Sequence, residues 1–126
     1  MDTRAKIVSA KQAAAQTADR NSTLLLSSFD VLTSARIHRV RALAQPDTLL
    51  IAVITELADS LLPLQARAEL AAALAIIDLV IVADESVAAL LTRFPGATVI
   101  DDNQDDARRT AELIEYVHQR NGKPAQ

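Results

Sequence analysis

The 126-residue sequence contains no cysteine, which excludes disulfide bonds, thiolate metal sites and thiol nucleophiles. Its two glycines, Gly96 and Gly122, are too few for a glycine-rich loop that cradles a phosphate. Aromatic residues make up 2% of the chain, and the formal net charge is −3. Because neither stacking side chains nor a broad basic surface is provided, we expect no nucleic-acid partner.

Long hydrophobic runs are also missing. The most apolar stretch, residues 70–82, is shorter than the about 20 residues that cross a bilayer as a helix, and it contains Asp78. Residues 1–20 lack the apolar core of a secretory signal peptide. We therefore expect no membrane partner and a cytoplasmic location.

Half of the residues are hydrophobic, and most of these are Ala, Leu, Ile or Val, which suits helices packed on a parallel sheet. The length fits one domain over residues 1–120, followed by a tail at 121–126. Short apolar runs predict buried strands at residues 24–29, 49–54, 79–82 and 98–100. Helices are predicted over residues 3–19, 37–44 and 105–120, from Pro63 onwards, and after a cap at Ser86. This alternation predicts an α/β fold, a Rossmann-like three-layer α/β/α arrangement with right-handed crossovers.

Several segments, in order, resemble one family. Lys6-Ile7-Val8-Ser9, the strand Leu24–Leu26 and Phe29-Asp30-Val31-Leu32 are similar to the start of cytidylyltransferase-like proteins of the nucleotidylyltransferase superfamily. The closest resemblance is to the adenylyltransferase domain of ADP-heptose synthases, and it continues through Leu50–Val53, Pro63–Glu69 and Ile77–Val82. The resemblance covers about residues 6–85. It implies a Rossmann-like sheet with a nucleotide across the carboxyl ends of the strands, where helix N-termini meet phosphate.

The family's catalytic motif is not retained. After Phe-Asp-x-Leu, the family has two histidines separated by a small residue and a glycine. Here these two histidine positions hold Thr33 and Arg36, and the glycine position holds Ala35. The family's preceding Asn-Gly is replaced by Leu26-Ser27. Nucleotidylyl transfer depends on positioned donors for the triphosphate, so we expect no catalytic residues here.

Two further segments of the family pattern also lack features that would hold a triphosphate. The loop that carries glycine and lysine before the Pro-Leu helix corresponds to residues 58–62, which contain no lysine. The segment after the fourth strand corresponds to the acidic residues 101–106, which would repel a triphosphate. We therefore predict a catalytically silent relative, a pseudoenzyme without cofactor, that acts as an interaction or assembly module.

Two alternatives remain open. The chain could be a divergent nucleotidylyltransferase, acting on a sugar phosphate or alcohol phosphate, or a nucleotide-binding sensor; either would bind a Mg-nucleotide. The candidate nucleotide-binding residues are Ser27, Ser28, Phe29, Asp30, Thr33 and Arg36. Alternatively, the domain could work beside a partner, either a second copy in a homodimer or a sugar kinase, as the resemblance implies.

Each polar candidate also has an ordinary structural interpretation. For Arg36 an exposed surface position is favoured, and for Asp30 a cap of the following helix. The acidic group could hold Mg²⁺ or Ca²⁺, but it lacks the spacing of a calcium loop and is better explained as a solvated helix start. That group comprises Asp101, Asp102, Asp105 and Asp106. His38 and His118 are expected on the surface, and Arg67 and Glu69 early in a helix, available for a subunit contact.

Overall fold

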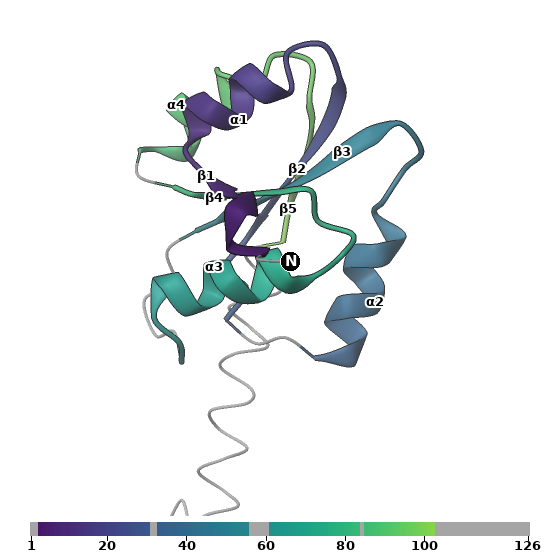
Figure 1. Cartoon of the computed structure of the whole chain (residues 1–126), viewed down its shortest axis with the longest axis vertical. Helices are drawn as coiled ribbons and strands as arrows, with labels where there is room; N and C mark the ends of the chain where they lie inside the picture. The colour runs from purple at the N-terminus through teal and green to yellow at the C-terminus, as the bar shows by residue number, and fades with distance from the viewer. Residues whose placement is uncertain (1–2, 31–32, 56–60, 84, 103–126) are drawn as a thin grey trace, which may run out of the picture.

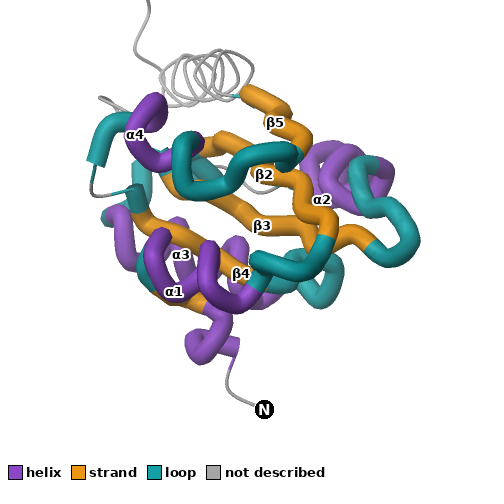
Figure 2. The backbone as a smooth tube through the Cα atoms, turned by 90° about the horizontal axis from the view of Figure 1, so that it is seen from above, coloured by secondary structure: helices purple, strands orange, loops and turns teal. Residues whose placement is uncertain are grey.

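The computed structural model describes residues 3–30, 33–55, 61–83 and 85–102. These ranges form an α/β fold around one five-stranded, all-parallel sheet, with the strand order β1-β4-β3-β2-β5. Figure 2 shows the strands lying side by side from β5 through β2 and β3 to β4. The strands are β1 (Ile7–Val8), β2 (Asn21–Ser27), β3 (Thr48–Ile54), β4 (Leu79–Val82) and β5 (Thr98–Asp101). The predicted parallel sheet is confirmed.

Helices cover both faces of this sheet (Figure 1). They are α1 (Ala10–Gln16), α2 (Ser34–Ala42), α3 (Leu64–Ala73) and α4 (Val87–Leu91), preceded by a 3-10 helix, η1 (Thr3–Lys6). Val40 of α2 and Ala71 of α3 share one apolar cluster with Leu25. Ala13 of α1 and Leu90 of α4 belong to a second cluster on the opposite face. The arrangement is therefore the expected Rossmann-like three-layer α/β/α fold.

The central strands are continuous apolar runs because both of their faces are covered. Leu24, Leu25 and Leu26 of β2 are all buried, although successive side chains point to opposite faces. The stretch from Leu50 to Ile54 in β3 is buried in the same way. Such runs are recognisable in a sequence, and for this reason the strands predicted at residues 24–29, 49–54, 79–82 and 98–100 are found close to those positions.

The N-terminal segment is different from the single helix predicted over residues 3–19, and that prediction is wrong. Ile7 pairs with Val80 and Val8 with Ile81, so β1 forms an extra edge strand. The Lys6 Nζ donates to the carbonyls of Leu74 and Ile77 at 3.1 and 2.9 Å, which ties η1 to the end of α3. The helix begins only after Ser9, which forms a capping box with Gln12.

The other element boundaries move by a few residues. Asn21, two residues after the end of the predicted first helix, begins β2. Thr33 caps α2, and Pro63 stands at the N-cap of α3 instead of its first turn. Ser86 caps α4 as predicted, by accepting from the backbone N–H of Ala89 at 3.1 Å. The predicted helix at 105–120, the tail at 121–126 and His118 lie outside the described residues.

Within the described ranges, no helix combines the length and the apolar character needed to cross a membrane.

Candidate functional site

The strand order places a candidate site at the carboxyl ends of β2 and β5. From β2 the chain moves through α2 to β3 and through α3 to β4, and then it returns through α4 to β5 on the other side of β2. The direction of winding therefore reverses at β2, which has β3 on one side and β5 on the other. In open α/β sheets, ligands bind at such a switch point, outside the carboxyl ends of the strands. Here those ends are Ser27 in β2 and Asp101 in β5.

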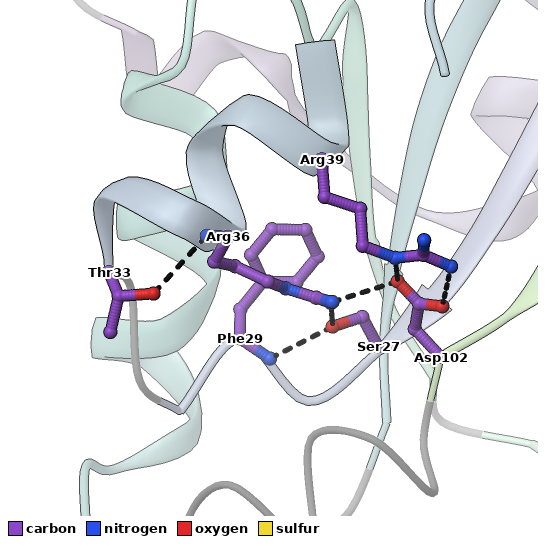
Figure 3. Close-up of polar contacts among 6 residues, drawn as sticks. All are labelled: Ser27, Phe29, Thr33, Arg36, Arg39 and Asp102. Atoms are coloured by element: carbon purple, nitrogen blue, oxygen red, sulfur yellow. Dashed lines mark hydrogen bonds and ion pairs between the residues drawn. The ribbon is translucent and has the colours of Figure 1, made fainter. Parts of the chain in front are cut away.

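Arg36 occupies this position. It lies in the first turn of α2, where the Thr33 hydroxyl accepts from the Arg36 backbone N–H at 3.2 Å. Its side chain is 1% exposed, and its Nη1 donates to Asp102 Oδ2 at 2.8 Å while its Nη2 donates to Ser27 Oγ (Figure 3). The guanidinium carbon lies 5.6 Å from the centre of the Phe29 ring, within the range of a cation–π contact. The guanidinium is thus fixed on several sides.

Arg39, one turn further along α2, binds the same Asp102 carboxylate. Its Nε donates to Asp102 Oδ2 at 3.0 Å and its Nη2 to Oδ1 at 2.8 Å, a side-on bidentate pair. The Asp102 side chain is 2% exposed, whereas that of Arg39 is 43% exposed. The hydrogen bond from Arg39, supported by the charges of both arginines against the opposing effect of burial, lowers the pKa of Asp102 below its usual value. Asp102 is therefore a buried anion between two cations.

Two further charged residues, Asp30 and Arg67, are buried at the carboxyl ends of β2 and β3 and form a second charge cluster, after that of Arg36, Arg39 and Asp102. Asp30 accepts from the backbone N–H groups of Leu61 and Leu62 at 2.6 and 2.8 Å, and so holds the approach to α3. Arg67 in α3 is 2% exposed, and its Nη1 donates to the carbonyls of Ser28 and Thr55 at 3.1 and 2.8 Å. These contacts bind α3 and the residues before it to the ends of both strands.

The chain turns sharply between the two charge clusters. Phe29 is buried and has φ of 52°, a left-handed conformation that is strained for a bulky residue. Its backbone N–H lies 3.4 Å from Ser27 Oγ, which also accepts from Arg36. The residues on either side of Phe29, namely Ser28 and Asp30, make the contacts to Arg67 and to the approach to α3. This strained residue therefore links the two clusters.

The structure brings together Ser27, Phe29, Thr33 and Arg36 of the six predicted nucleotide-binding residues (Figure 3). Ser28 contributes its backbone carbonyl to Arg67 instead, and Asp30 serves the chain before α3. All six of these residues therefore have partners inside the protein.

Four structural interpretations are wrong. Arg36 is buried, not exposed, because Asp102 and Ser27 supply its partners. Thr33, not Asp30, caps α2.

Asp102 is buried against the two arginines instead of lying in a solvated helix start, although Asp101 is exposed. Arg67 is buried under the strand ends and is not available for a subunit contact. His38 is exposed, as predicted, and Asp105 and Asp106 lie outside the described residues.

Sequence reasoning missed Arg39 and the role of Asp102. Arg39 follows Arg36 by three residues, a spacing that places two side chains on one face of a helix, and this signal could have identified it. Among the residues that the structure describes, no three histidine, aspartate or glutamate side chains gather into a group that could hold a metal ion.

A cavity of about 550 Å³ lies at the amino ends of the strands, here called the amino edge of the sheet. It is opposite the carboxyl edge, where the strands end and Arg36 and Asp102 lie. It lies between the end of α1, the start of β2 and the turn that leads from α4 to β5. The lining residues are Ala14, Thr17, Ala18, Asp19, Arg20, Asn21, Ser22, Arg93, Phe94, Pro95, Gly96 and Ala97. Its charged groups, Asp19, Arg20 and Arg93, are exposed.

Comparison of the chain with models of protein families and with curated proteins finds no match. The resemblance to nucleotidylyltransferases therefore stays a prediction.

Proposed function

We propose that this chain is a catalytically silent nucleotidylyltransferase-like domain that serves as an interaction or assembly module. The observation that carries the proposal is the Asp102 carboxylate, which lies at the switch point of the sheet and is held there by Arg36 and Arg39. A negative group of the protein itself therefore occupies the place where a Rossmann-like fold would receive a phosphate.

The energetic cost of opening this site supports the proposal. A nucleotide that used the two arginines would have to displace Asp102 and leave its charge without them. Breaking a buried ion pair by removing one partner costs about 3–5 kcal/mol. At about 1.4 kcal/mol per factor of ten, this amounts to a loss of roughly 150- to 4,000-fold in nucleotide affinity.

The residues at the two histidine positions of the resembling family also have other roles here. The Thr33 hydroxyl caps α2, and the Arg36 guanidinium pairs with Asp102 and Ser27. Rate enhancement in nucleotidylyl transfer comes from donors aimed at the developing charge on the phosphate. Donors that are already engaged inside the protein supply little of that stabilisation.

The proposal is tested by adding ATP and CTP, each with Mg²⁺, to the purified chain and following the melting temperature. We expect no shift at millimolar nucleotide and no pyrophosphate release with sugar phosphates or alcohol phosphates. A rise in Tm that grows with nucleotide concentration would contradict the proposal, since a ligand that binds the folded state stabilises it. If the Arg39→Gln variant lost that rise, the alternative of a nucleotide sensor or divergent transferase would be supported.

The partner that we propose for the module is a second copy of the chain. Within the described residues, β5 lies at one edge of the sheet, and its Val99 side chain is 43% exposed. Edge strands present backbone groups that can pair with another chain. We expect a dimer by light scattering, weakened by Val99→Lys more than by Thr98→Lys, because Thr98 is also exposed but lacks an apolar side chain. A monomer would favour a different partner, such as the sugar kinase that the resemblance suggests.

A further inference from the structure

We propose that Ser27, Arg36 and Arg39 form an oxyanion site and that Asp102 fills it as a tethered ligand. The site accepts a small external oxyanion, either a carboxylate or a phosphate, once the Asp102 carboxyl group is absent. This inference rests on the proposed function in one respect. It explains the catalytically silent domain by a phosphate site that Asp102 occupies, and not by a site that has been lost.

The contacts have the geometry of ligand recognition. Three N–H donors from two guanidinium groups reach the two carboxylate oxygens: Arg39 binds both, at 3.0 and 2.8 Å, and Arg36 adds a bond of 2.8 Å. Guanidinium groups bind carboxylate and phosphate in this forked manner, in which the oxygens of either group can meet parallel donors. The donors recognise an oxyanion, and nothing in these contacts depends on the rest of the aspartate.

One of the two guanidinium groups is held in place without help from Asp102. Arg36 is fully buried, donates to Ser27 Oγ and lies over the Phe29 ring (Figure 3). Ser27 is the last residue of β2, and Phe29 lies two residues beyond it. The receptor side of the site therefore comes from one continuous part of the fold, β2 and α2, and persists when the carboxylate is removed.

The ligand side comes from elsewhere in the chain. Asp102 is separated from Arg36 by 66 residues and follows β5, where its backbone N–H donates to the Leu26 carbonyl at 2.9 Å. Because Arg39 is 43% exposed, one wall of the site borders solvent. Tethering gives the Asp102 carboxylate an effective concentration in the millimolar range or above. An external oxyanion at lower concentration does not displace it from the intact protein.

The test uses the Asp102→Ala variant of the full chain, since this change removes one carboxyl group and leaves a space that matches formate. Melting temperatures are measured in chloride, formate and phosphate at equal ionic strength, with the wild type in parallel. We expect the variant to melt lower in chloride and to gain on the order of 5 °C more than the wild type at high formate or phosphate. The wild type corrects for the general stabilisation that phosphate gives by exclusion from protein surfaces.

Two further variants make the result specific. Adding Arg39→Gln to Asp102→Ala removes the bidentate donors, so the anion-dependent gain should be lost. The Glu85→Ala variant breaks the exposed pair in which Arg93 Nε lies 2.8 Å from Glu85 Oε1, and it should show no such gain. Recovery with formate alone indicates a carboxylate ligand, whereas recovery with phosphate indicates that the site admits a tetrahedral group.

Equal gains in the wild type and in Asp102→Ala overturn the inference, as does a gain that persists in the double variant. Should Asp102→Ala fail to fold in chloride, the yield on refolding from urea in formate against chloride replaces the melting temperature, and equal yields overturn the inference. The nucleotide titration tests the proposed function on the wild type, and its Arg39→Gln arm is needed only if the wild type responds. Its outcome can therefore contradict the proposed function while the oxyanion site stands, and the reverse also holds.

Discussion

Polar groups are held differently at the carboxyl edge of the sheet, where the parallel strands end, and at its amino edge, where they begin. At the carboxyl edge, Asp30, Arg36, Arg67 and Asp102 are buried, and each has fixed partners within the protein. At the amino edge, a cavity of about 550 Å³ is lined by charged side chains that remain exposed, among them Arg20. A buried charge must be matched by partners, whereas an exposed one keeps its water. The contrast predicts that stability depends on charges at the first edge and hardly at all on those at the second.

The largest effect is expected for Asp102→Ala in chloride buffer. The change leaves the buried Arg36 guanidinium without its carboxylate, and removing one partner of a buried pair costs about 3–5 kcal/mol in the free energy of unfolding. Urea denaturation followed by circular dichroism measures this loss. The matched control is Asp101→Ala, because Asp101 is the exposed neighbour in β5. Equal losses in the two variants would show that the buried cluster does not dominate stability at this edge.

A smaller loss is expected for Arg67→Met, which separates charge from hydrogen bonding at the same edge. The guanidinium donates to two neutral carbonyls, and its buried Nε makes no hydrogen bond within the described part of the chain. Leaving such carbonyls without a donor costs about 1–3 kcal/mol, less than stranding a charge. Gln65→Met, at an exposed position of α3, serves as the control in the same urea experiment. A loss larger than that of Asp102→Ala would reverse the ranking.

Acid should remove the contribution of Asp102. Since the arginines lower its pKa in the folded state, the folded state binds this proton less readily than the unfolded state, in which an aspartate has a pKa of about 3.9. The stabilisation is complete above that unfolded pKa and is lost as the pH falls towards the folded pKa. The difference in unfolding free energy between the wild type and Asp102→Asn should be constant from about pH 7 to 5 and shrink below about pH 4. A difference that instead shrank between pH 7 and 5 would exclude this carboxylate as its source.

The sequence was informative where structure depends on neighbouring residues. The runs Leu24–Leu26 and Leu50–Ile54 predict strands covered on both faces, and a sheet of parallel strands follows from their alternation with helices. The two residues of β1 could not be identified in this way, because their pairing with Val80 and Ile81 spans more than half of the chain. The alanines after Ser9 favour a helix locally, and the predicted helix was extended too far towards the N-terminus.

The candidate site divides along the same line. The positions Ser27, Phe29, Thr33 and Arg36 lie within ten residues and were identified from the sequence as a group. Their partner Asp102 lies 66 residues from Arg36, in an acidic run that has the composition of a solvated helix start. Only the register of β5 against β2, which pairs Leu26 with Asp101, brings the carboxylate beside α2. Such a tertiary contact has no local signature.

The smallest effect is expected at the amino edge, for Arg20→Ala. Arg20 is exposed beside the cavity, and its side chain forms no hydrogen bond or ion pair within the described ranges. A surface substitution of this kind changes the unfolding free energy by less than about 0.5 kcal/mol. The matched variant is Arg36→Ala, which removes the same side chain from the carboxyl edge and should lose several times more. If Arg20→Ala destabilised the protein as strongly as Arg36→Ala, burial would not explain the difference between the edges, and the amino-edge cavity would contain a structural charge of its own.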